Sequence, residues 1–230
     1  MGGTLTRLCA FDLDGTLIDS QYHIVSAMAA AFASEGMTSP LAAEVRRVVG
    51  LSLDQAIKQL APAIAGLQVE RLGEAYRDAY FSAQAVSDAV EPLFPGAVDA
   101  LGALEAQGWL LGVVTGKGRR GLHTVLEAHG IRDRFITLKS ADDGPGKPDP
   151  SLLFDAVDEA GSTPGRTIMV GDTVFDLQMA RRARVTALGV TWGYHGIPQL
   201  RAEAPAAILD RFGELPNAAE RLVPREMREA

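Results

Sequence analysis

The chain has 230 residues, of which 47% are hydrophobic and 22% are charged, a composition typical of a globular protein that can bury a full core. Its formal net charge of -7 provides no basic footprint for a nucleic-acid partner, although an acidic chain can still bind phosphate where local cations or a metal ion dominate the field. Cys9 is the only cysteine, and we find neither a signal segment nor an apolar run long enough to span a bilayer, so we expect a cytoplasmic protein with no disulfide and no membrane partner.

The first predicted element is a buried strand over Leu8–Phe11, which leads directly into two acids one residue apart, Asp12 and Asp14, and a Gly-Thr turn. In open α/β sheets, ligands bind in the crevice at this carboxyl end of the strands. Two carboxylates held there repel each other unless a cation lies between them, and oxygen ligands favour Mg²⁺. One acid would then be free for nucleophilic or acid–base chemistry. For this segment alone, a strand followed by an ordinary Asp-Gly turn is the alternative.

A long interval of about a hundred residues separates Asp12 from the next predicted strand, whereas a single crossover needs about thirty. The interval is rich in Ala, Leu and Glu, and breaks divide it at Gly36–Pro40, Gly50–Ser52 and Ala61–Pro62. These breaks predict four helices.

The position of this insertion, just after the first acidic pair, favours a lid. We expect a four-helix cap domain over residues 20–91, inserted into a core formed by residues 1–19 and 92–230. Its hinges would lie near Leu17–Ser20 and Ala89–Phe94. Lids of this kind exclude water and supply substrate contacts. A helical subdomain without a catalytic role is the alternative.

Strands and helices alternate along the rest of the chain. The predicted strands are Leu110–Val114, Phe135–Leu138, Thr167–Val170, Val185–Val190 and Ala206–Leu209. Apolar residues at helical spacing predict helices at Ala97–Gln107, Gly121–His129, Leu152–Ala160 and Phe175–Ala183. The alternation predicts an α/β fold with a Rossmann-like parallel sheet and helices on both faces. A short charged helix is expected between Pro216 and Ala230.

A hydroxyl, a glycine and a cation follow the strand that ends at Val114, in the form of Thr115, Gly116 and Lys117. The Thr115 hydroxyl can donate to a phosphoryl oxygen while the Gly116 backbone approaches closely. Thr115 as a helix N-cap is the other interpretation, and the two are compatible.

A lysine in a stiff loop follows the third core strand. Lys147 precedes Pro148-Asp149-Pro150, where the prolines restrict the loop and allow a helix to begin near Pro150. A lysine fixed there can neutralise charge on a transferring phosphate. A solvent-exposed loop lysine is an equally good interpretation of this segment alone.

Two more acids follow the strand over Thr167–Val170. We expect Asp172 to be a metal ligand facing Asp12, and Asp176, in the first turn of a helix, to act through a water ligand or as a supporting acceptor. Acids also favour helix N-termini because of the helix dipole, but that explanation needs only one of the two.

Together, the segments FDLDGTLIDS, VVTGK, GKPDP and VGDTVFD resemble, in order and approximate spacing, the four motifs of the haloacid dehalogenase-like hydrolase superfamily. The resemblance runs from Phe11 to about Leu215 and is greatest to the phosphoglycolate phosphatase-like branch, whose members carry a helical cap after the first motif. One departure is Gly116, because the family usually has asparagine there. Any contact that relatives make through that side-chain amide therefore does not carry over.

The resemblance implies a role for each motif. Asp12 would be the nucleophile that forms an aspartyl-phosphate, and Asp14 the general acid/base. Thr115 and Lys147 would bind the phosphoryl group, close to the backbone of Gly116. The resemblance further implies that Mg²⁺ is held by Asp12, Asp172 and the Asp14 carbonyl, with Asp176 supporting its water shell.

The second acid also separates the chemistries of the family. Dehalogenase and phosphonate-cleaving relatives lack an acid at the position of Asp14, so its presence favours phosphotransfer. A sugar-phosphate mutase of the β-phosphoglucomutase type stays an alternative, although Gly171-Asp172 matches the phosphatase-like form. A catalytically silent binding or regulatory relative is a further alternative, against which the intact acids argue. A phospho-receiver module would be about half as long and would lack the insertion.

We therefore expect a phosphatase that hydrolyses a small phosphate ester, phosphoglycolate-like or a sugar phosphate, as a monomer or homodimer. Arg46 and Arg47, in the insertion, are candidates for binding a substrate carboxylate or phosphate. A solvated helix face is at least as good an interpretation of these two arginines.

Overall fold

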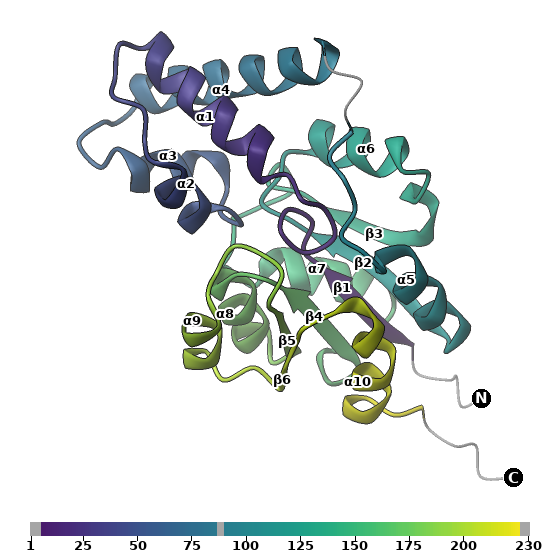
Figure 1. Ribbon diagram of the computed structural model, residues 1–230. Coiled ribbons are helices and arrows are strands. Elements are labelled where there is room, and N and C mark those ends of the chain that lie inside the picture. The colour runs from purple at the N-terminus through teal and green to yellow at the C-terminus, as the bar shows by residue number, and fades with distance from the viewer. Residues whose placement is uncertain (1–5, 87–89, 226–230) are drawn as a thin grey trace, which may run out of the picture.

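The computed structural model describes residues 6–86 and 90–225, and its centre is a six-stranded parallel sheet (Figure 1). The strands lie in the order β3-β2-β1-β4-β5-β6. Their bounds are β1 Arg7–Phe11, β2 Trp109–Val114, β3 Phe135–Lys139, β4 Thr167–Gly171, β5 Thr186–Val190 and β6 Ala207–Leu209.

Helices cover both faces of this sheet because β1 alternates between two cores. Cys9 and Phe11 pack into an apolar cluster with α5, α6 and α10, whereas Leu8 and Ala10 pack with α7 and α8. A strand buried on both faces has no solvated side, and this explains the unbroken apolar run before Asp12. The helix bounds are α5 Ala97–Ala106, α6 Arg119–Ala128, α7 Ser151–Glu159, α8 Val174–Ala183 and α10 Leu215–Leu222.

The described residues between β1 and α5 form four helices, which make a separate layer beyond the carboxyl ends of the strands (Figure 1). Their bounds are α1 Gln21–Ser34, α2 Ala42–Val48, α3 Leu53–Leu60 and α4 Leu67–Val86. They share an apolar cluster of their own, in which Ile24 and Phe32 of α1 pack with Ile57 of α3 and Leu72 of α4. The helical insertion, as α1–α4 are called below, thus has its own core.

The two connections to the helical insertion run side by side. The N–H of Asp19 donates to the carbonyl of Pro92 at 2.8 Å, and the N–H of Phe94 donates to the carbonyl of Leu17 at 2.9 Å. Both connections therefore leave the core at one place, next to the end of β1.

The predicted fold class is confirmed, and each of the six predicted strands lies within one residue of its observed bounds at both ends. The four predicted core helices agree within two residues, and α10 accounts for the first part of the predicted C-terminal helix. Residues 87–88 of the predicted cap domain, residue 89 of the predicted second hinge and residues 226–230 of the predicted C-terminal helix lie outside the described residues. Four short helices were not predicted: α9 Ile197–Ala202 and the 3₁₀ turns Arg132–Arg134, Pro164–Arg166 and Phe212–Glu214.

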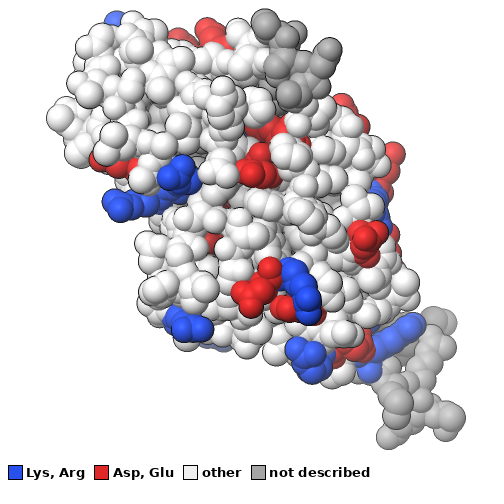
Figure 2. Space-filling model, in the orientation of Figure 1, with Lys and Arg blue, Asp and Glu red and all other residues white. Residues whose placement is uncertain are grey.

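Among the described residues, none of the helices combines the length and the apolar character needed to cross a bilayer. On the face shown in Figure 2, acidic and basic side chains are interspersed over a mostly uncharged surface.

Candidate active site

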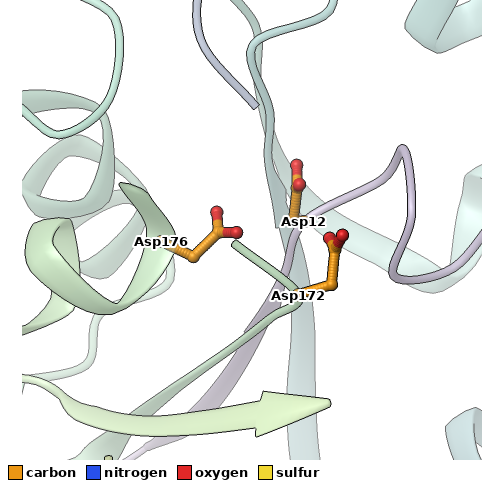
Figure 3. Close-up of side chains that lie close together, drawn as sticks. All are labelled: Asp12, Asp172 and Asp176. Carbon is orange, nitrogen blue, oxygen red and sulfur yellow. The ribbon is translucent and has the colours of Figure 1, made fainter. Parts of the chain in front are cut away.

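The carboxyl ends of the central strands bring the predicted site residues together. Asp12 directly follows β1, Thr115 follows β2 and Asp172 follows β4, while Lys147 belongs to the loop between β3 and α7. Because β1 lies between β2 and β4, these groups meet at one edge of the sheet. Figure 3 shows the carboxylates of Asp12 and Asp172 side by side, with Asp176 reaching toward them from α8.

Asp12 is fully buried, and its surroundings have opposing effects on its charge: burial favours the neutral carboxylic acid, whereas the Lys147 ammonium favours the carboxylate. Its Oδ1 lies 2.7 Å from Nζ of Lys147, while its Oδ2 has no hydrogen-bond partner among the described residues. Burial raises the pKa of Asp12 from 3.8 to about 7; Lys147 opposes this shift, and the charges of Asp176 and Asp14 add to it. A cation beside Oδ2 would stabilise the carboxylate form that a nucleophile requires.

Lys147 is buried completely, and it is not a solvated loop lysine. Its Nζ lies 2.6 Å from Oδ1 of Asp176 as well as 2.7 Å from Asp12. Burial works against the ammonium form, but the two carboxylates outweigh it and raise the pKa of Lys147. The side chain is therefore a fixed positive charge beside Asp12.

The side chain of Asp172 is held in place by hydrogen bonds to both of its carboxylate oxygens. Oδ1 accepts from the Thr16 hydroxyl at 2.9 Å, and Oδ2 accepts from the Tyr194 N–H at 2.8 Å. Two glycines make room for it: a Cβ on Gly15, whose φ is +90°, would lie 2.4 Å from Oδ2, and one on Gly193 would lie 2.3 Å from it. Burial raises the pKa of Asp172 well above its ordinary value, and Asp12 and Asp176 add to the shift.

Asp176 caps helix α8 with one carboxylate oxygen and contacts Lys147 with the other. Its Oδ2 accepts from the N–H and the hydroxyl of Thr173, at 3.1 and 2.7 Å, in the capping box of α8. Its Oδ1 accepts from Lys147 at 2.6 Å. Asp176 is therefore the acid of the α8 capping box, as the helix-terminus interpretation predicts, and it also contacts Lys147.

The residues present fit a divalent cation with oxygen ligands. Carboxylate oxygens of Asp12, Asp172 and Asp176 lie within 4.8 Å of one another in a buried cluster. Oδ2 of Asp12 has no hydrogen-bond partner among the described residues, and a buried carboxylate oxygen left in that state is costly. Asp176 already pairs with the Lys147 ammonium, which would repel a cation there, whereas the partners of Asp172 are neutral donors, so Asp12 and Asp172 are the better direct ligands.

Asp14 has a partner that was not predicted from the sequence. Its Oδ1 accepts from Nζ of Lys117 at 2.9 Å, and the same Nζ lies 3.8 Å from Oε2 of Glu91. Glu91 lies 11 residues after Tyr80 in the chain and accepts from its hydroxyl at 2.5 Å. The nearest sequence signal was Lys117 itself, at the end of a core strand.

Thr115 contacts its own loop in the core, whereas Gly116 packs against the helical insertion. The Thr115 side chain is buried and its Oγ1 accepts from the Lys117 N–H at 3.1 Å; it is not the N-cap of α6, whose N-cap residue is Gly118. Gly116 packs against the helical insertion, and a Cβ there would lie 2.4 Å from the carbonyl oxygen of Leu51. Its contact is thus with the insertion's backbone.

A cavity of about 660 Å³ joins Asp12 and Asp14 to the helical insertion. Apolar side chains of the helical insertion, such as Met28 and Val48, are among the groups that line it. Neither Arg46 nor Arg47 lines it; the arginines that do are Arg77 and Arg120. The structure therefore brings the motif residues together but leaves the two predicted arginines outside the cavity.

Comparison with known proteins agrees with this geometry. A family model described as "Haloacid dehalogenase-like hydrolase" matches residues 9–190. "Probable phosphatase IndB" of Dickeya dadantii is 37% identical over 94% of each chain, and "Phosphoglycolate phosphatase" of Pseudomonas putida is 34% identical over 95% of this chain and 82% of its own.

Solved structures give the same result. A hydrolase from Pseudomonas syringae superposes with a TM-score of 0.83 and 29% identity, covering 94% of this chain and 99% of its own. A haloacid dehalogenase-like family hydrolase from Streptococcus pneumoniae superposes with a TM-score of 0.78 and 26% identity, covering 91% and 96%.

Proposed function

The chain belongs to the haloacid dehalogenase-like hydrolase family, and we propose that it is a Mg²⁺-dependent phosphatase that hydrolyses a small phosphorylated metabolite through an aspartyl-phosphate. The observation that carries the proposal is the buried Asp12 with a free Oδ2, a fixed ammonium at 2.7 Å and a second acid two residues away. The phosphatase names of its curated relatives support the same reaction class.

In the first half of the reaction, Asp12 attacks phosphorus. A bond forms between its carboxylate oxygen and phosphorus while the bond to the ester oxygen breaks, and that oxygen takes the proton of Asp14. Lys147 and the Thr115 hydroxyl lie at the same edge of the sheet and stabilise the charge on the equatorial phosphoryl oxygens.

In the second half, Asp14 acts as a base. It takes a proton from a water molecule whose oxygen attacks phosphorus, and the bond to Asp12 breaks, which releases inorganic phosphate and restores the carboxylate. Burial excludes other water from Asp12, since its side chain is fully covered.

Mg²⁺ would be held by Asp12, Asp172 and the Asp14 carbonyl, and when bound it supplies Lewis-acid stabilisation of the phosphoryl charge. Asp176 supports the site through Lys147. The donor set consists of oxygens alone, as a hard cation requires.

The substrate belongs to the phosphoglycolate or sugar-phosphate class. The cavity that opens from Asp12 and Asp14 into the helical insertion, our proposed cap, would receive its leaving group. Named phosphoglycolate phosphatases are among the relatives, so phosphoglycolate is the first compound to test.

The experiment is a panel of phosphorylated metabolites assayed for phosphate release, with Mg²⁺ and with chelator. We expect Mg²⁺-dependent release by the natural chain and none by Asp12→Asn, with Asp14→Asn reduced at least about 10²-fold. No release from any ester would contradict the proposal and favour a silent relative. Isomerised sugar phosphate without net release would favour a mutase.

A further inference from the structure

A second charged cluster, separate from the metal-binding acids, lies where the core meets the helical insertion. It comprises Lys117 after β2, Glu91 in the connection that returns from the insertion, and Tyr80 and His23 on α4 and α1. The side chains of Lys117 and Glu91 are 9% and 0% exposed. Burying such ions costs desolvation free energy, so a buried ion pair at this position suggests a role beyond stability.

The Lys117 ammonium is fixed from several directions. Its Nζ lies 2.9 Å from Oδ1 of Asp14, 3.8 Å from Oε2 of Glu91, and 4.6 Å from the centre of the Tyr80 ring. Its aliphatic stem lies over Gly121 of α6, where a Cβ would come within 3.1 Å of Cε. A lysine normally has wide rotamer freedom, and these contacts remove it.

Glu91 is in turn fixed by the helical insertion. Its Oε1 accepts from the Tyr80 hydroxyl at 2.5 Å and lies 3.6 Å from Nδ1 of His23. Its backbone carbonyl lies 2.7 Å from Nε2 of His129 in the core. Glu91 therefore ties the ammonium that contacts Asp14 to helices of the insertion.

We propose that Lys117, held by Glu91 and Tyr80, is a positioning residue that fixes the carboxyl group of Asp14 for proton transfer to the leaving group. The inference rests on the proposed function, because it assigns a role to Asp14 in that reaction. By engaging Oδ1, Lys117 leaves the second oxygen of Asp14 to face the ester oxygen. The proton path is unchanged: Asp14 gives its proton to the ester oxygen as the phosphorus–oxygen bond breaks.

The alternative role for Lys117 is a direct contact with an anionic substrate. The two roles differ in what a Lys117→Met variant loses. A positioning residue matters most for esters whose poor leaving groups need protonation, whereas a substrate contact matters equally for every ester that makes it. Esters with uncharged leaving groups remove any contact with an anionic leaving group, and a contact with the phosphoryl group would be lost equally for every ester.

The test is kcat/KM for p-nitrophenyl, phenyl and benzyl phosphate, measured for the natural chain and for Lys117→Met. We expect a loss of about 10²-fold for the benzyl ester and much less for the p-nitrophenyl ester, so that dependence on the leaving group becomes steeper. Lys139→Met is the matched control, since it removes a lysine that pairs with Glu159 outside the cluster. It should leave the series unchanged.

A second variant separates positioning from folding. Removing Lys117 alone leaves Glu91 buried without its counter-charge, so we combine it with Glu91→Gln, which removes that charge. The double variant should recover thermal stability while keeping the steeper leaving-group dependence. If kcat/KM depends on the leaving group equally steeply in the variants and in the natural chain, the positioning role is wrong while the proposed function stands. If the natural chain has no turnover at all, the proposed function itself is wrong.

Discussion

The ammonium of Lys147 lies 2.7 Å from Oδ1 of Asp12, and neither side chain is more than 1% exposed. The pair joins a loop after β3 to the end of β1, two strands that are not neighbours in the sheet. A positive charge is therefore in place beside Asp12 before any phosphate arrives, and the incoming phosphoryl group shares it.

Replacing Lys147 with Met should destabilise the chain by about 3–5 kcal/mol, because Asp12 and Asp176 would keep buried charges without their partner. Urea unfolding measures the loss, and phosphate release should fall to background. Lys139→Met, which removes a pair with a 49% exposed glutamate, should cost less than about 1 kcal/mol. An equal loss of unfolding free energy in the two variants would show that the buried ion pair contributes no more to stability than the exposed one.

Gly116→Ala should lower kcat/KM about tenfold or more, because its Cβ would lie 2.4 Å from the Leu51 carbonyl and force the helical insertion away from the site. The matched control is Gly165→Ala, where a Cβ meets no atom within 4 Å. Steady-state kinetics on the best substrate checks both. Full activity in Gly116→Ala would mean that the close contact with Leu51 is not needed during turnover.

Arg120 should contribute to binding substrates with an anionic leaving group. It lines the cavity with Arg77, and its guanidinium carbon lies 3.9 Å from the centre of the Phe81 ring. We expect Arg120→Met to raise KM severalfold for such esters and to leave neutral ones unchanged. Arg46→Met and Arg47→Met are the comparison. A larger effect from either of these would support the sequence-based assignment instead.

The stabilising effect of Mg²⁺ should grow with pH. In the folded chain the pKa of Asp12 is raised to about 7, with Lys147, Asp176 and Asp14 facing it. The stability that Asp12 contributes is complete below its ordinary pKa of 3.8 and is lost as the pH rises through about 7. The raised pKa of Asp172 acts in the same direction.

A bound cation replaces the lost proton, so Mg²⁺ should raise Tm more at about pH 8 than at about pH 6. Thermal unfolding with Mg²⁺ and with chelator measures the difference. Asp12→Asn should show a smaller difference between the two pH values. A larger Mg²⁺ effect at the lower pH would contradict the assignment of Asp12 to the metal.

The strands and the ends at which the acids lie could be predicted from the sequence, because a parallel strand buried on both faces is apolar without interruption. Cys9 and Phe11 face one core and Leu8 and Ala10 the other, so the run over Leu8–Phe11 has no polar position. A short helix such as α9, six residues with Pro198 at its start, contains too few turns to show a helical period.

The pairings within the site could not be predicted in the same way. The bond between Lys117 and Asp14 joins residues 103 positions apart, and it depends on how β2 lies next to β1. Glu91 belongs to none of the sequence motifs, because its contacts with Tyr80, His23 and Lys117 arise only when the insertion folds. Arg46 and Arg47 had the right charge for a substrate contact, but local sequence does not determine which arginines of the insertion line the cavity.

If Asp12 is the nucleophile, it becomes phosphorylated during turnover. The direct measurement is mass spectrometry of the chain after acid quench of a reaction with substrate and Mg²⁺, with peptide mapping of the adduct. We predict a phosphoryl group on Asp12, which accumulates in Asp14→Asn if the second half of the reaction is slowed more than the first. A natural chain that releases phosphate while Asp12 carries no adduct, together with an Asp12→Asn variant that still turns over, would show that Asp12 is not the nucleophile.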